Sequence, residues 1–94
     1  MRPEPDQEAR LTLLAEPGAV HRVRVVDLSG RHLRCSLEAE LLPGALVEIE
    51  GPDWLLLGEV ERLERGHPSV VLVRVEHALF DTAELAQQRR IWTG

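Results

Sequence analysis

The sequence predicts an all-β fold, a small six-stranded antiparallel barrel with one helix at its C-terminal end. Apolar residues alternate with polar ones in several short stretches, most clearly at 33–39. Glycine and proline turns such as Pro43-Gly44 separate these stretches at regular intervals. A flat sheet of this size would leave its edges exposed, so a closed or nearly closed barrel is favoured. A barrel of the SH3 or translation-factor kind is the alternative fold.

The first part of the chain predicts a tail and two strands. Residues 1–9 are charged, carry two prolines and lack an apolar anchor, so we expect a flexible tail before a single domain at 10–94. A short strand at 11–14 ends in a turn at 16–18, and a second strand covers 21–28. The apolar phase of that second strand slips by one residue at Val25-Val26, which predicts a β-bulge.

The rest of the chain predicts four more strands and the helix. The strands are expected at 33–39, 47–49, 55–63 and 71–76. Gly58 interrupts the longest of them and indicates a bend or bulge where the sheet curls. Asp81 followed by Glu84 is typical of a helix N-terminus, and good helix formers continue, so a helix is expected at about 81–92.

Composition narrows the classes of function. The chain has 94 residues and a net charge of −5, which argues against a nucleic-acid polymer as partner because that requires a basic stripe. Its one cysteine, Cys35, excludes an internal disulfide and fits a reducing compartment. Neither a long apolar run nor a secretory leader is visible, so we expect a cytoplasmic protein without a membrane span.

A strand, a short turn and a second strand occupy residues 23–35, and the turn reads Asp27-Leu28-Ser29. Leu42-Pro43-Gly44 and Leu57-Gly58-Glu59-Val60 follow. Together these segments resemble the PilZ family, small bacterial β-barrels that sense cyclic di-GMP. The resemblance implies that Asp27 and Ser29 read a guanine edge, since a carboxylate accepts hydrogen bonds and a hydroxyl both donates and accepts them. Alternatively, both side chains satisfy amides of the turn itself.

The nucleotide-binding signature of that family is incomplete here. His32 occupies the final glycine position of the Asp-x-Ser-x-x-Gly loop, and residues 1–26 contain no Arg-x-x-x-Arg clamp for the phosphates. Arg10, Arg22 and Arg31 remain as candidate phosphate contacts. We therefore expect weak or lost nucleotide binding, with a genuine cyclic di-GMP effector as the alternative.

Candidate partner-binding residues come from two segments. The run Trp54-Leu55-Leu56-Leu57 is apolar on both strand phases, so either both sides are covered or Leu56 faces a partner. The expected helix presents Leu85 and Trp92, which either cover one barrel mouth or dock a protein partner or a second copy of the chain.

Catalytic and metal chemistry have little support in the sequence. No nucleophile stands beside a base in a recognisable pattern, so we expect no enzyme and no cofactor. Three hypotheses remain: a PilZ-like adaptor that binds protein, a cyclic di-GMP effector, and a metal- or redox-active domain that uses His32 and Cys35. The adaptor is favoured because the arginine clamp is missing.

Overall fold

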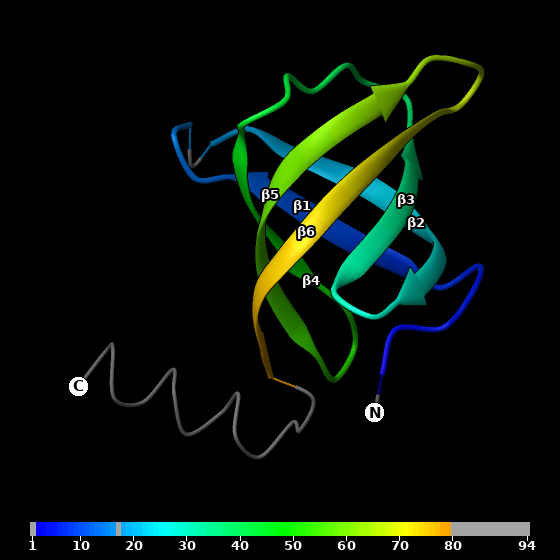
Figure 1. Cartoon of the computed structure of the whole chain (residues 1–94), viewed down its shortest axis with the longest axis vertical. Helices are drawn as coiled ribbons and strands as arrows, with labels where there is room; N and C mark the ends of the chain where they lie inside the picture. Colours follow the sequence, from blue (N-terminus) through cyan, green and yellow to red (C-terminus); the bar gives the residue numbers. More distant parts are fainter. Residues whose placement is uncertain (1, 17, 80–94) are drawn as a thin grey trace.

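The computed structural model describes residues 2–16 and 18–79, which form a closed antiparallel β-barrel (Figure 1). Its strands are β1 (Glu8–Leu13), β2 (Val20–Ser29), β3 (His32–Leu37), β4 (Leu46–Glu50), β5 (Leu55–Glu64) and β6 (Ser69–Leu79). Around the barrel they follow the order β1-β2-β3-β6-β5-β4, and β4 pairs with β1 to close it. The predicted all-β, six-stranded barrel is confirmed, while the helix expected at 81–92 lies outside the described residues.

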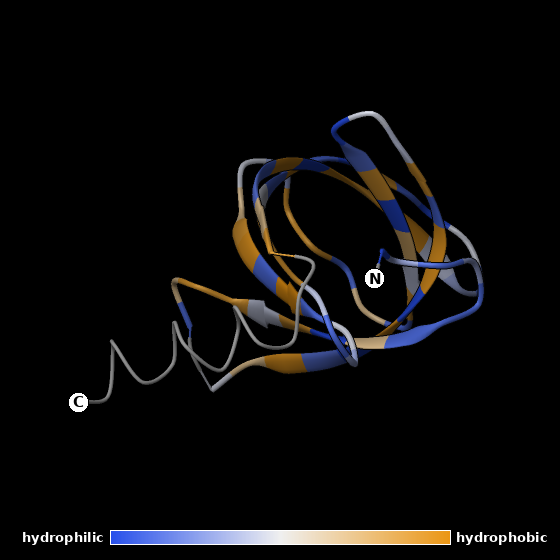
Figure 2. Cartoon of the chain, turned by 90° about the horizontal axis from the view of Figure 1, so that it is seen from below, coloured by the Kyte–Doolittle hydropathy of each residue, from blue (hydrophilic) through white to orange (hydrophobic). Residues whose placement is uncertain are grey.

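The barrel interior is a core of leucine and valine with a few other apolar residues. Figure 2 shows hydrophobic and hydrophilic residues alternating along the strands that surround it. On β3 the inward residues Leu33, Cys35 and Leu37 are buried and the residues between them are half-buried. This is the period-two pattern of the sequence, because successive side chains of a strand point to opposite faces. Full burial of one such aliphatic side chain contributes about 1.5–3 kcal/mol to folding.

The predicted bulge in β2 is present and changes which side chains face outward. Pairing with β3 shifts between Val25 and Asp27, so that Val25 lies opposite Cys35 whereas Asp27 lies opposite Arg34. Before the shift the odd-numbered Val23 and Val25 are buried, and after it Asp27 is no longer in their phase. The bulge therefore places Asp27 on the outer surface of the barrel.

Gly58 also lies at an irregularity, as predicted. The register between β5 and β6 shifts between Leu57 and Gly58. A Cβ atom built on Gly58 would lie 2.4 Å from the carbonyl oxygen of Arg74 and 2.8 Å from Cγ1 of Val73. Only glycine allows the two strands to approach so closely here.

Part of the segment expected to be a flexible tail, residues 1–9, belongs to the barrel. Glu8 and Ala9 belong to β1, and Ala9 is buried. The backbone amide of Asp6 donates to the Val25 carbonyl (2.8 Å), and the Val25 amide donates to the Gln7 carbonyl (2.9 Å). The Gln7 side chain also accepts a hydrogen bond from the Trp54 indole Nε1 (2.9 Å). The segment is therefore anchored by the polar contacts of Gln7 as well as by the buried Pro3 and Ala9, and the contact with Trp54 cannot be found by searching for apolar residues.

Candidate functional site

The Asp27 carboxylate, the principal candidate for nucleotide recognition, is held by Arg34 on the neighbouring strand. Arg34 Nε donates to Asp27 Oδ1 at 3.0 Å, and Arg34 Nη2 donates to Asp27 Oδ2. These hydrogen bonds lower the pKa of Asp27, and the carboxylate in turn raises the pKa of Arg34. Both carboxylate oxygens therefore have a partner within the barrel, which is the bidentate geometry that arginine favours.

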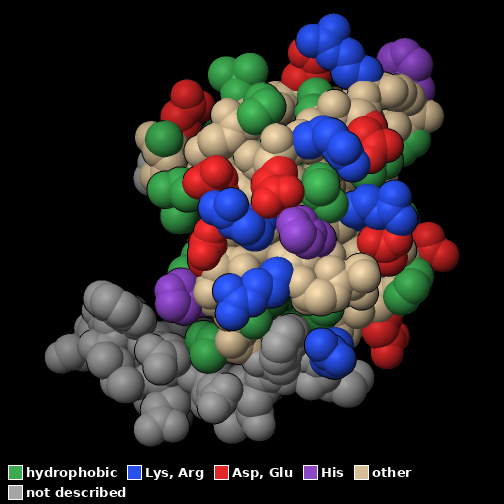
Figure 3. Space-filling view, viewed as in Figure 1, with side chains coloured by type: hydrophobic (Ala, Val, Ile, Leu, Met, Phe, Trp, Pro, Cys, Tyr) green, Lys and Arg blue, Asp and Glu red, His purple; other side chains and the backbone are tan. Residues whose placement is uncertain are grey.

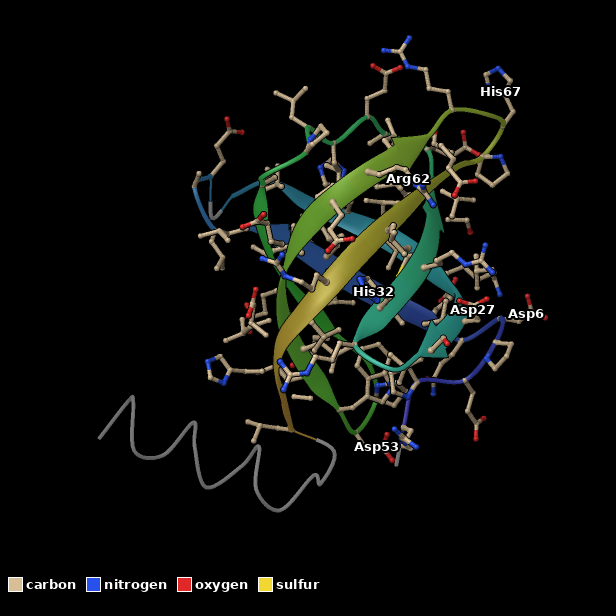
Figure 4. The ribbon with its side chains drawn as sticks, viewed as in Figure 1. Asp6, Asp27, His32, Asp53, Arg62 and His67 are labelled. Carbon is tan, nitrogen blue, oxygen red and sulfur yellow. The ribbon has the colours of Figure 1, made fainter. Side chains whose placement is uncertain are left out.

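The surface around this ion pair contains a shallow depression of about 390 Å³. Its lining residues are Asp27, Ser29, His32, Arg34, Arg62 and Leu72. Figure 4 labels three residues of this region, Asp27 on β2, His32 on β3 and Arg62 on β5. Ser29 is exposed at the end of β2, opposite His32. The depression thus keeps Asp27 and Ser29 together, as the sequence suggested. A guanine base, however, would compete with Arg34 for the carboxylate.

We expect an Asp27→Asn variant to be less stable than the wild type at neutral pH and to approach it in acid. The pKa of Asp27 is lowered in the folded state, so its contribution is complete above the unfolded value near 3.8 and is lost as pH falls through the folded pKa. Urea unfolding of both proteins at several pH values measures the difference. Glu16→Gln is the matched control, because Glu16 is exposed and lies in the β1–β2 turn. A difference that grows with acid would contradict the ion pair.

Two of the three candidate phosphate contacts, Arg10 and Arg22, are cross-strand neighbours, and Arg31 lies elsewhere. Arg10 on β1 is opposite Arg22 on β2, and its Nη2 lies 3.0 Å from Oε1 of Glu50. Arg22 is five positions before Asp27 on the same strand, which corresponds to roughly 16 Å of extended chain. Arg31 belongs to the β2–β3 turn and lines a different depression. The structure therefore does not bring Arg10 and Arg22 to the Asp27 turn.

A band of alternating charge covers the outer face of β3, β6 and β5 (Figure 3). Arg74 is its centre, with nitrogen–oxygen distances of 3.0 Å to Glu76, 3.7 Å to Glu61 and 3.8 Å to Glu59. His32 Nε2 lies 3.3 Å from a carboxylate oxygen of Glu61. Arg34 and Arg74 were not among the predicted site residues, although the even phase of β3 and of β6 places both on the outer face. Around Arg74 three carboxylates face one guanidinium group, so this part of the band has an excess of negative charge and is unsuited to a phosphate ligand.

His32 and Cys35, the candidates for metal or redox chemistry, lie on opposite faces of β3. Cys35 is fully buried in the core, and burial raises the pKa of its thiol to about 12. His32 points outward toward Glu61. The two side chains cannot bind one ion, and residues 2–16 and 18–79 contain no group of three His, Cys, Asp or Glu side chains arranged for a metal.

We expect the Cys35 thiol of the folded protein to be inert toward Ellman's reagent at mildly alkaline pH. The thiolate is the reactive form, and a buried thiol with a pKa of about 12 supplies very little of it. The absorbance of the released chromophore measures the reaction. The control is the same protein unfolded in concentrated guanidinium chloride, in which the thiol should react completely. Rapid labelling of the folded protein would contradict the buried position.

The partner-binding prediction for Trp54 and Leu56 is wrong. Both side chains are buried in the core. Leu56 belongs to the buried set of alternate residues on β5, and Trp54 stands directly before that strand in the same phase. A Cβ atom on Gly51 would lie 2.1 Å from Cε2 of Trp54, so the indole packs directly on that glycine. The other two candidates, Leu85 and Trp92, lie outside the described residues.

The first part of β2 has an open edge that the sequence analysis missed. Residues Val20–Arg24 pair with β1, but pairing with β3 begins only at Arg24 (Figure 1). The hydrogen bonds from Leu13 to Ala19 and from Val25 to Gln7 direct the odd-numbered residues of this stretch to β1. The backbone groups of Val20 and Arg22 therefore face away from β1, and within the described residues no other strand pairs with them.

A groove of about 490 Å³ lies beside this open edge. Its floor is apolar, with Val23, Leu37, Ala39 and Pro68. Its rim contains Val20, which is 51% exposed, together with charged residues from β1, β2 and the segment after β3. No local sequence pattern indicates such a groove, since it forms where two strands separate.

In comparisons with known proteins, no family model, no curated protein and no solved structure matches the chain. The PilZ resemblance therefore rests on the segments quoted from the sequence. The described residues also include no helix long and apolar enough to cross a membrane.

Proposed function

We propose that this chain is a non-enzymatic, PilZ-like adaptor domain that binds another protein and has little or no affinity for cyclic di-GMP. The observation that carries the proposal is the contrast between two surfaces. Asp27 already has Arg34 as a bidentate partner, whereas the first part of β2 leaves backbone groups open beside an apolar groove. The first surface is neutralised, and the second has the features of a protein-binding site.

The buried thiol and the absence of an internal disulfide suit a reducing compartment, so we place the adaptor in the cytoplasm. The net charge of −5 and the excess of carboxylates around Arg74 argue against a nucleic-acid polymer as the partner.

Two measurements test the adaptor. Calorimetry with cyclic di-GMP should give no heat, and the melting temperature should stay unchanged at high micromolar nucleotide. An affinity-tagged domain should retain a specific protein, and a Val20→Lys variant should lose it because lysine blocks strand pairing at an open edge. Leu42→Lys is the matched control, since Leu42 is 79% exposed and lies outside the groove. Saturable nucleotide binding, or no retained protein, would contradict the proposal.

A cyclic di-GMP effector is the second candidate, and one observation favours it. Arg2, from the segment before β1, and Arg31, from the β2–β3 turn, line one depression of about 220 Å³. Leu28, Leu56 and Val75 give this depression an apolar part. In the family that the sequence resembles, the phosphate clamp also comes from the segment before the first strand. If this candidate is correct, calorimetry gives saturable heat that Arg31→Ala abolishes and Arg65→Ala leaves intact.

A further inference from the structure

The open edge of β2 can accept a strand because its backbone groups are fixed in an extended conformation. Val20 and Arg22 are held by the pairing of β2 with β1, and their free N–H and C=O groups point toward the groove. An extended segment placed there would make main-chain hydrogen bonds of the kind that β3 makes from Arg24 onward. Addition of a strand to an exposed sheet edge is a common mode of peptide recognition.

The groove determines what the inner side chains of such a segment should be. Successive side chains of a strand alternate, so every second one would face the floor formed by Val23, Leu37, Ala39 and Pro68. Val23 and Leu37 are buried, whereas the charged residues that line the groove are all exposed; these are Glu8, Arg22, Arg24 and Glu38. Apolar side chains therefore suit the inner positions.

The charge at the rim determines the outer side chains. Arg24 is engaged by the carbonyl of Asp6 (2.7 Å) and by the Glu8 carboxylate (3.6 Å). Arg22 has no ion pair within the described residues, and its cross-strand neighbour Arg10 is paired with Glu50. The exposed Glu38 also lines the groove and disfavours acidic side chains near it, so a carboxylate on the incoming segment is favoured at the position beside Arg22, because opposite charges across neighbouring strands attract.

A second copy of the chain fits this edge less well. Two β2 edges related by a two-fold axis would bring Arg22 and Arg24 of one copy next to the same residues of the other. Like charges on adjacent strands are destabilising. The edge thus favours a different protein with acidic residues.

We infer that the β2 edge at Val20–Arg22 binds an extended segment of a partner protein in which apolar and acidic residues alternate, and that this segment adds to the barrel as a further strand. Strand addition here rests on the protein-binding function proposed above, and it specifies the partner's chemistry.

The probe is a capped hexapeptide of alternating glutamate and valine, titrated into the isotope-labelled chain and followed by NMR. We expect saturable shifts at the Val20 and Arg22 amides and slower hydrogen exchange at both. A peptide with arginine in place of glutamate should bind at least about fivefold more weakly, and a peptide with a central proline should not bind, since proline lacks the N–H.

Charge reversal in the protein is the decisive variant. Arg22→Glu should invert the preference between the two charged peptides, while Arg62→Glu, on the outer face of β5, should leave it unchanged. Failure of the glutamate peptide to bind, equal binding of the proline peptide, or an unchanged preference in Arg22→Glu would overturn strand addition. Strand addition by a partner would also be overturned if the chain sedimented as a dimer in which the β2 amides are protected from hydrogen exchange. If the tagged domain still retains its protein when the peptide fails, only strand addition falls; if both fail, the adaptor function falls too.

Discussion

Replacing Trp54 with alanine is expected to lower the free energy of unfolding by about 3–5 kcal/mol, the usual cost of removing a buried aromatic side chain. Trp54 is fully buried, packs on Gly51 and donates its indole N–H to Gln7. The variant loses the packing, leaves a cavity and releases the segment before β1. The total free energy of unfolding of a native protein is about 5–15 kcal/mol, so this single substitution should leave the barrel only marginally stable.

Urea unfolding followed by far-UV circular dichroism measures this loss. Leu42→Ala is the control, because Leu42 is 79% exposed and its truncation should change stability by no more than about 0.5 kcal/mol. Gln7→Ala separates the hydrogen bond from the packing and should cost about 1 kcal/mol or somewhat more, since the indole N–H is left without its partner. A Trp54→Ala protein as stable as Leu42→Ala would disprove the buried position.

Gly58→Ala should have the second largest effect, a loss of about 1–3 kcal/mol that is typical of an overpacked site. The added methyl group would lie 2.4 Å from the Arg74 carbonyl oxygen, which is backbone and cannot move aside as a flexible side chain could. Relief requires β5 and β6 to separate where their register shifts.

Thermal or urea unfolding compares this variant with Gly18→Ala. Nothing lies within 4 Å of a Cβ atom on Gly18, so the same substitution there should be neutral or slightly stabilising. Equal effects of the two substitutions would show that the close approach at Gly58 is relieved without cost.

Most of the fold could be predicted because each strand carries its own signal. Alternation at Leu33, Cys35 and Leu37 marks the inner face of β3, and the slip at Val25-Val26 marks the bulge. The segment before β1 could not be predicted in this way. Its contacts depend on Gln7, whose amide reaches Trp54 in a distant part of the chain.

The sites were less accessible to sequence reasoning. The Asp27–Arg34 ion pair follows from the register that the β2–β3 turn sets, in which Ser29 lies opposite His32 and Asp27 opposite Arg34, and the turn register is not visible in the alternation of apolar residues alone. Trp54 and Leu56 were assigned to a partner because apolar residues on both strand phases do not indicate which phase is buried. The open edge of β2 exists because pairing with β3 covers β2 only from Arg24 onward. No residue in the sequence marks where that pairing ends.

The strand order has a consequence for how quickly the barrel assembles. Consecutive strands pair as hairpins from β1 to β3 and again from β4 to β6. The pairs β1–β4 and β3–β6, in contrast, join strands that are far apart in sequence; Arg10, for example, lies opposite Glu50. Long-range pairings of this kind slow the folding of small β-proteins into the millisecond-to-second range. In stopped-flow refolding, we expect the two halves to become compact early and the docking of their seams to limit the rate.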